Sequence, residues 1–123
     1  MTGFLLVGLG GALGAMARYG AGLAATRLGA GDFPWATLFV NVAGGLAMGV
    51  LAGTLGAEDH SARQLLGVGL LGGFTTFSAF SIETVRLIEG GQADVALGYA
   101  LASVLLSVSA CWIGLLLGRG ATA

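Results

Sequence analysis

The residues most able to do chemistry centre on a polar interruption at 72–81, inside an otherwise apolar stretch. Two glycines, Phe74 and two threonines stand there, so residues that weaken a helix occur where a membrane span needs one. In hydrocarbon, every backbone N–H and C=O group must find a partner inside the protein. Unwound backbone is tolerated only where protein covers it or water reaches it, and it forms ion sites in other membrane proteins. The pattern therefore predicts a helix that is broken near 72–76 and exposes its backbone dipoles.

Hydroxyl groups follow one face of the last apolar stretch. Tyr99, Ser103 and Ser107 are spaced four residues apart, which places their side chains in one row on a helix. A row of donors inside a membrane either bonds to a neighbouring helix or replaces the water around a passing ion. Asn41, in the second apolar stretch, has the same two interpretations, because its amide carries two donors and an acceptor.

Aromatic and charged side chains accompany the predicted break. Phe77 and Phe80 lie three residues apart on one face just beyond it. Such a pair either packs against its neighbours or turns its ring edges, which carry positive quadrupole density, toward a small anion that must not bind too tightly. Arg18 either lies at membrane depth, where it would attract anions, or extends to the interface. Glu83 and Arg86 have the i, i+3 spacing of an ion pair on a helix.

Nothing in the sequence indicates an enzyme. It contains no cluster of metal-ligating residues, no nucleophile with a base and no phosphate-binding loop, and its one histidine, His60, lies in a predicted loop. The single cysteine, Cys111, cannot form an intramolecular disulfide and is expected to pack among apolar residues. The five cations are all arginines and form no cluster, which argues against nucleic acid as a partner.

Composition indicates a small membrane protein. Of its 123 residues, 56% are hydrophobic and 9% are charged, whereas soluble domains carry about 25% charged residues. Mean hydropathy is +0.93. Since a spanning helix needs roughly 20 apolar residues, residues 1–123 have room for a single domain of four spans. We expect these spans at about 3–25, 34–55, 64–88 and 95–117.

Local signals mark some of the span boundaries. Pro34 suits the first turn of the second helix. Ser61 and Gln64 have the spacing of a capping box before the third. Asp94 suits the start of the fourth, because a negative charge is favourable at a helix N-terminus. We expect residues 118–120, which include two glycines, to end that helix.

The charges that flank the spans give almost no preference for one orientation in the membrane. With four spans, both termini and the central loop share one side, which holds Arg63 and Arg119, while the other side holds Arg27. The cation bias that normally fixes topology is therefore close to zero. Either weak charges still fix one topology, or the chain inserts both ways and two opposite copies pair about an axis in the membrane plane.

These motifs together resemble the CrcB/Fluc family of fluoride channels. Residues 10–19 (GGALGAMARY) look like the first helix of the family, and residues 36–44 (ATLFVNVAG) are similar to its second. Residues 72–81 (GGFTTFSAFS) look like its signature in a broken third helix. The resemblance covers essentially the whole chain. Two positions depart from the family pattern: Ala79, where threonine is frequent, and Ala36, where glycine is common.

The resemblance implies an all-α membrane protein of four transmembrane helices with a broken third helix, paired as an antiparallel, dual-topology homodimer. It implies a structural sodium ion, Na+, at the dimer interface, held by the backbone carbonyls of Gly72 and Thr75, since hard cations prefer oxygen ligands. It further implies fluoride pores with Arg18 at the vestibule. The residues implied to line each pore are Asn41, Phe77, Phe80, Tyr99, Ser103 and Ser107.

The expected function is passive export of fluoride from the bacterial cytoplasm by a multi-pass protein of the lipid bilayer of the inner membrane. Such export protects the cell from fluoride toxicity. The expected export occurs by electrodiffusion of the anion through a selective pore and needs no enzymatic step.

Two other functions are compatible with four short apolar helices. A small proton-coupled multidrug exporter can also insert in both orientations, but it needs a carboxylate in its first helix, where this chain has Arg18. A non-transporting assembly subunit would explain the small-xxx-small glycine pairs, such as Gly10 with Gly14 and Gly45 with Gly49. It would leave the interruption and the hydroxyl row unexplained.

Overall fold

The chain is entirely helical in the computed structural model, which describes residues 1–123 and contains no strand. Four stretches are long and apolar enough to cross a membrane, which confirms the prediction of an all-α, multi-pass membrane protein. The third stretch, His60–Glu89, consists of several helical pieces. The elements are α1 Thr2–Arg27, α2 Trp35–Thr54, α3 His60–Ala62, the π-helix η1 Arg63–Leu71, α4 Gly72–Phe74, α5 Ser78–Glu89 and α6 Ala93–Thr122.

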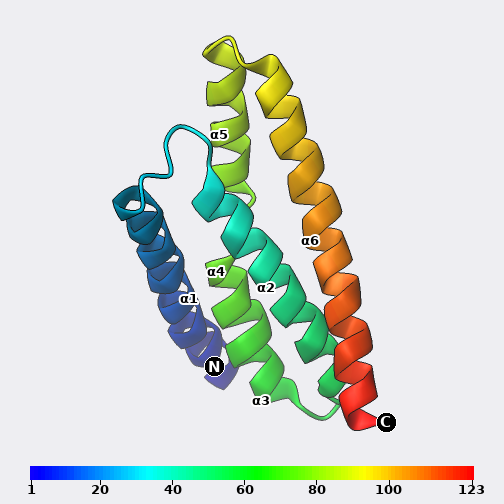
Figure 1. The fold of residues 1–123 in the computed structure, drawn as a ribbon. Helices are drawn as coiled ribbons and strands as arrows, with labels where there is room; N and C mark the ends of the chain where they lie inside the picture. The colour runs from blue at the N-terminus through cyan, green and yellow to red at the C-terminus, as the bar shows by residue number, and fades with distance from the viewer.

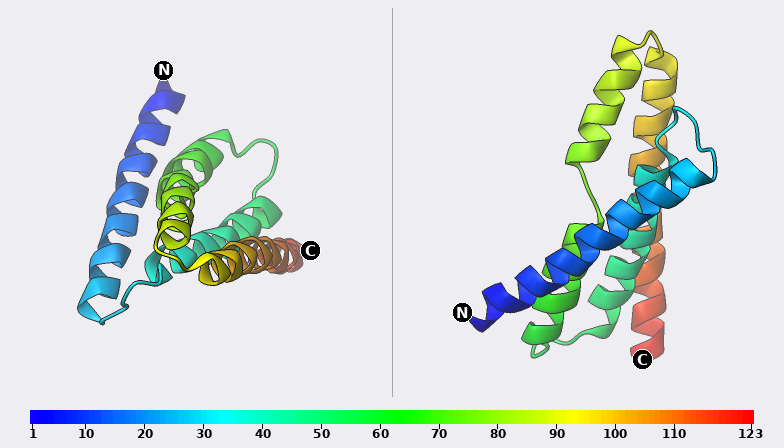
Figure 2. Two further views of the ribbon diagram at one scale, coloured as in Figure 1. Left: turned by 90° about the horizontal axis from the view of Figure 1, so that it is seen from above. Right: turned by 90° about the vertical axis from the view of Figure 1, so that its left-hand side faces the viewer.

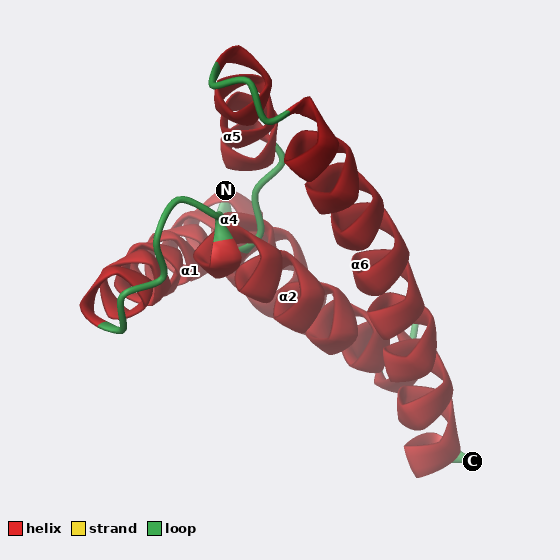
Figure 3. Cartoon of the chain, turned by 45° about the horizontal axis from the view of Figure 1, so that its top comes forward, coloured by secondary structure: helices red, strands yellow, loops and turns green.

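Both chain termini lie at the same end of the molecule, as an even number of spans requires. Figure 1 shows them near the connection from α2 to α3, with the α1–α2 and α5–α6 connections at the opposite end. In the side view of Figure 2, α1 crosses the other helices obliquely. Figure 3 shows α1 and α6 on opposite sides of α2, which makes α2 the central element.

The last helix is longer than the sequence predicts. Residues 118–120 do not end it, because Gly118 packs against the backbone of Gly53 in α2 and the helix continues to Thr122. Thr122 Oγ1 donates a hydrogen bond to the carbonyl of Gly118 at 3.3 Å. At about 1.5 Å per residue, α6 is ~45 Å long, whereas the hydrocarbon core of a bilayer is ~30 Å thick. Its ends therefore extend beyond the apolar window on which the prediction rested.

The third span begins before the predicted capping box. α3 starts at His60 and has no side-chain cap. The preceding Asp59 carboxylate accepts a hydrogen bond from the N–H of Gly56 at 2.7 Å, which closes the loop after α2. The Gln64 side chain lies over the first turn of α1 rather than over its own helix start. The capping box predicted for Ser61 and Gln64 is therefore wrong.

Glycines let the helices pack backbone against backbone. α2 packs mainly on α6, and α1 packs mainly on η1 and α4. A Cβ added at Gly49 of α2 would collide with the carbonyl of Cys111 and stand 2.7 Å from the backbone nitrogen of Leu115. On α1, a Cβ at Gly10 or Gly14 would collide with backbone carbonyls of η1. The small-xxx-small spacing therefore serves close helix packing.

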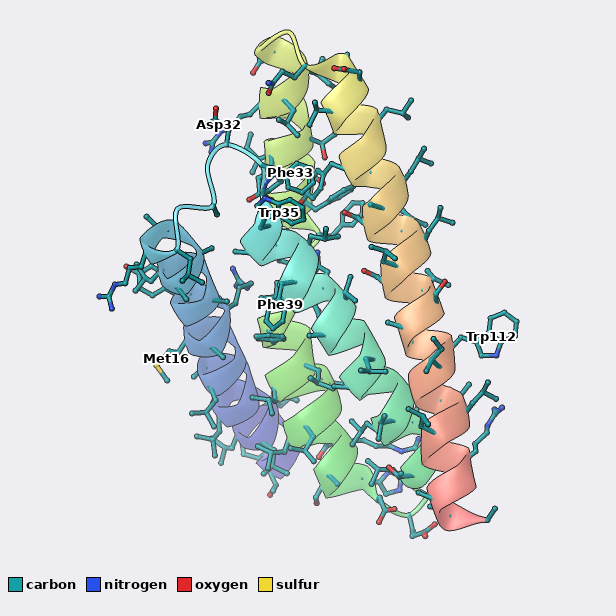
Figure 4. All side chains as sticks on the ribbon, viewed as in Figure 1. Met16, Asp32, Phe33, Trp35, Phe39 and Trp112 are labelled. Atoms are coloured by element: carbon teal, nitrogen blue, oxygen red, sulfur yellow. The ribbon has the colours of Figure 1, made fainter.

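Few side chains are buried inside the chain, and large apolar side chains face outward. The buried residues number 14 of 123, and a small core of Leu87, Ala96 and Tyr99 joins α5 to α6. Met16 and Trp112 are 62% and 67% exposed, and Figure 4 shows them pointing outward on opposite sides. An apolar surface of this extent suits a protein surrounded by lipid or by another membrane subunit.

Gly49→Ala is expected to destabilise the protein, because its Cβ has no room against the α6 backbone. Overpacking of this kind costs about 1–3 kcal/mol. The matched control is Gly98→Ala in α6, where an added Cβ meets nothing within 4 Å. The thermal unfolding midpoint of the purified protein should fall in the first variant and not in the second. Equal midpoints would contradict the backbone packing of α2 on α6.

Candidate functional site

The third span is interrupted after Phe74, where α4 ends and Thr75 adopts an extended conformation with φ −83° and ψ 159°. The N–H and the Oγ1 of Thr75 both donate to the carbonyl of Leu71, each at 3.0 Å. The next N–H, that of Thr76, leaves the helix ladder and bonds to another helix. Regular structure resumes at Ser78, the first residue of α5.

Asn41 of α2 takes the place of the missing helix partners. Its Nδ2 donates to the carbonyl of Thr76 at 2.9 Å, and the N–H of Thr76 donates to Asn41 Oδ1 at 2.8 Å. The amide therefore pairs with the unwound backbone as a second peptide group would, and satisfies the donor and the acceptor together. One Asn41 N–H remains available, because the amide has two donors and uses one.

Three carbonyl groups at the interruption accept no hydrogen bond in the structure, those of Gly72, Phe74 and Thr75. The carbonyl of Gly73, by contrast, accepts a bond from Arg18 Nε at 3.1 Å. Free carbonyl oxygens inside an apolar span are costly unless a ligand or water meets them. The interruption therefore offers free oxygen ligands of the type that hard cations prefer.

A polar pocket opens beside the interruption between α2, α5 and α6. Its volume is about 330 Å³, and no charged side chain lines it. It brings together five of the six predicted pore residues, with Tyr99 the exception. The lining residues are Asn41, Thr75, Thr76, Phe77, Phe80, Ser103, Val104, Ser107 and Val108.

The two serines of this polar pocket have no partner in the protein. The Oγ atoms of Ser103 and Ser107 are both buried and neither makes a hydrogen bond. Leaving a buried hydroxyl unpaired costs about 1–3 kcal/mol. Of the two interpretations of the hydroxyl row, a bond to a neighbouring helix is therefore not realised by either serine. Both hydroxyls are free for a ligand or water in the pocket.

Aromatic rings continue from the polar pocket into the core. The Phe77 and Phe80 ring centroids lie 5.5 Å apart, and Phe80 is 5.2 Å from Tyr99. Tyr99 in turn makes a T-shaped contact with Phe33, with ring centroids 5.4 Å apart, and Figure 4 shows Phe33 next to Trp35 at the start of α2. Phe77 is 78% exposed while Tyr99 is fully buried. These ring contacts thus hold Phe80 in place and leave most of Phe77 exposed.

Glu83 of α5, whose spacing predicts only an ion pair with Arg86, is a polar centre that connects three helices. Its Oε2 accepts a hydrogen bond from Thr37 Oγ1 at 2.9 Å, and its Oε1 accepts one from the Tyr99 hydroxyl at 3.1 Å. These bonds join α2, α5 and α6, and the carboxylate oxygens do not go to Arg86 as the spacing suggested. The available signal was an acid within an apolar span, which is rarely without a function.

Arg18 lies in a second cavity, on the other side of the interruption from the serines. This cavity has a volume of about 390 Å³ and also contains Glu83, Thr37 and Ala79. Thr76 lines both cavities and so separates them. The bond from Arg18 Nε leaves the terminal NH₂ groups of the guanidinium without a protein acceptor. The charged side chains thus gather on one side of Thr76 and the neutral donors on the other.

Comparison with known proteins decides the family. Residues 5–115 match the model of the family described as "CrcB-like protein, Camphor Resistance (CrcB)". The chain belongs to this family. The CrcB-like match spans most of the four helices and both halves of the interrupted third span.

Similar proteins from several bacteria are named "Fluoride-specific ion channel FluC". The chain is 53% identical to the protein of Hyphomonas neptunium, over 97% of each chain. It is 52% identical to that of Caulobacter sp. strain K31, over 97% of this chain and 96% of the relative. It is 56% identical to that of Paracoccus denitrificans, over 95% and 94%. These relatives are ion channels by name, not enzymes.

Asn41→Ala is expected to destabilise the CrcB-like chain, because it removes the partners of both the N–H and the carbonyl of Thr76. Each buried group left unpaired costs about 1–3 kcal/mol. The control is Thr54→Ala, which removes a hydroxyl that bonds only to carbonyls of its own helix. The thermal midpoint should fall several-fold further in Asn41→Ala than in the control. A similar small shift in both variants would show that the amide does not hold the interruption.

Proposed function

We propose that the chain is a fluoride-selective channel that lets cytoplasmic fluoride leave the cell passively. The observation that carries the proposal is the polar pocket, in a chain about half identical over its whole length to proteins named as fluoride channels. The pocket combines free hydroxyls, a free amide N–H and aromatic rings, and no fixed charge lines it. This is the lining that a strongly hydrated small anion needs in order to enter and to leave again.

The donors act by replacing water around the ion. The Asn41 N–H and the hydroxyls of Ser103 and Ser107 donate to fluoride, and the ring edges of Phe77 and Phe80 add weak positive potential. The Tyr99 hydroxyl, engaged by Glu83, extends the row at one end. Because no cation is fixed along this lining, no single position holds the anion long enough to stop conduction.

The direction of flux follows from the acidity outside the cell. In acidic surroundings fluoride is partly present as neutral HF, which crosses the bilayer and dissociates in the more alkaline cytoplasm. The anion is then trapped, and a selective pore lets it leave down its own gradient. Arg18 would concentrate anions at the mouth of the path, since its terminal NH₂ groups have no protein acceptor.

The interruption is the broken third helix of such a channel, and its free carbonyls are suited to a structural sodium ion. Gly72 and Thr75 each offer a carbonyl oxygen without a hydrogen-bond donor, which is the ligand type that the ion prefers. Sodium shared by two subunits would compensate these dipoles in the apolar span. It would hold the interruption of one subunit against that of the other.

An antiparallel, dual-topology homodimer completes the proposal. The small charge difference between the two ends, with Arg63 and Arg119 at one and Arg27 at the other, favours no single insertion. Phe77 lines the polar pocket and is still 78% exposed, so one subunit alone does not close the path. A second, inverted copy would cover this side chain and provide a second path.

Fluoride efflux from liposomes that contain the purified protein tests this function. A fluoride electrode should record rapid release, and parallel vesicles should release no chloride. Phe80→Ile should lower the fluoride rate about tenfold or more, the effect of ~1.4 kcal/mol on the barrier. The control Phe4→Ile changes a side chain of α1 that is 83% exposed and does not line the pocket, and this variant should conduct normally.

No fluoride release from a well-folded wild-type dimer would refute the channel and favour an assembly subunit. Wild-type efflux with an unchanged Phe80→Ile rate would remove the ring-edge role alone.

Sodium removal is expected to impair both activity and stability. Replacing sodium with N-methyl-D-glucamine at constant ionic strength should slow efflux and lower the thermal midpoint, because ligand binding to the folded state stabilises it. Sodium bound after extensive dialysis should be measurable by elemental analysis. Full efflux in a preparation without detectable sodium would exclude a structural role for the ion.

A further inference from the structure

We propose that Gly44 is a positioning residue that sets the direction of the Thr75 carbonyl, by accommodating the Thr75 methyl group in a notch on α2. The inference rests on the proposed function, in which this carbonyl is a sodium ligand. Gly44 is buried, and its notch faces the interruption rather than another regular helix.

The contact between the two residues leaves no room for a side chain at 44. A Cβ added at Gly44 would collide with Thr75 Cγ2, with Phe74 Cδ2 next nearest at 3.4 Å. The colliding atom is a methyl group and not backbone. This distinguishes Gly44 from Gly45, where the nearest atom to an added Cβ is the backbone carbonyl oxygen of Ser107 at 2.9 Å.

The Thr75 side chain cannot turn away from this contact without losing a bond. Its Oγ1 donates to the carbonyl of Leu71 at 3.0 Å, and the two branches on its Cβ turn together about χ1. Moving Cγ2 out of the Gly44 notch would therefore rotate the hydroxyl away from Leu71. The alternative is a shift of the Thr75 backbone, which would redirect its free carbonyl.

The notch works together with the amide one turn earlier on α2. Asn41 and Gly44 are three residues apart and lie on the same face of the helix. Asn41 holds the backbone of Thr76, and Gly44 holds the side chain of Thr75. Thr75 and Thr76 are thus both held by α2. The Thr75 carbonyl, which lies between these two contacts, therefore has little freedom to turn.

Gly44→Ala combined with Thr75→Ser provides the test, because serine keeps the hydroxyl and lacks the methyl group that would collide. The measurement is the thermal midpoint of the dimer titrated with sodium, with N-methyl-D-glucamine as the replacement cation. Gly44→Ala should raise the half-saturating sodium concentration about tenfold, within the usual range for residues in contact. Adding Thr75→Ser to Gly44→Ala should restore most of the lost sodium affinity.

Two further variants make the result specific. Thr75→Ser alone should weaken sodium binding less than Gly44→Ala does, because the methyl is missing but nothing collides. Gly45→Ala should not be rescued by Thr75→Ser, since its Cβ meets α6 backbone. If Gly44→Ala does not fold, recovery of a folded dimer in the double variant supports the notch, and failure to recover overturns it.

The inference is overturned if Gly44→Ala binds sodium as tightly as the wild type does. It is also overturned if adding Thr75→Ser to Gly44→Ala fails to restore sodium affinity. Failure of the proposed function looks different. In that case the wild type shows no sodium-dependent midpoint and no fluoride efflux, while the coupling of Gly44 and Thr75 is still measurable as non-additive stability in the same four proteins.

Discussion

The structure depends on how an unwound stretch of backbone is satisfied inside an apolar span. A peptide group that leaves the helix ladder in hydrocarbon must find another partner, or the span does not form there. Asn41 provides that partner by exchanging two hydrogen bonds with the backbone of Thr76. Arg18 takes the carbonyl of Gly73 in the same way. Because these groups are satisfied, other carbonyls of the interruption, such as those of Gly72 and Thr75, can stay free for a ligand.

α2 positions both sides of the site, since it contacts both the interruption and α6. The face with Asn41 and Gly44 holds residues of the interruption, while Gly45 and Gly49 admit the α6 backbone. Glycine at the second pair of positions brings α6 close enough for Ser107 to line the same pocket as Asn41. The close packing of α6 on α2 is therefore also what places the polar side chains of α6 in the pocket lining.

The sequence predicted what local spacing determines and missed what only the assembled helices determine. Apolar windows identified four spans, but not that α6 continues to Thr122, because this end is stabilised by contacts with α2. Ser103 and Ser107, which share a helix face, line one pocket, whereas Tyr99 of the same row does not. Glu83 was paired with Arg86 from spacing alone, whereas the fold brings it the Tyr99 hydroxyl from another helix.

The separation of charge from neutral donors explains how one small chain can both attract an anion and release it. A full charge 4 Å from a bound ion contributes about 4 kcal/mol even at an effective dielectric constant of 20, enough to slow its departure greatly. Arg18 and Glu83 lie in the cavity on one side of Thr76, and the polar pocket on the other side has no charge. Glu83 is also held by two hydroxyls that donate to it, which fixes where its negative charge lies. In the proposed channel, Arg18 attracts the anion outside the polar pocket, against the opposing charge of Glu83 in the same cavity, and only neutral donors act where the anion must move on.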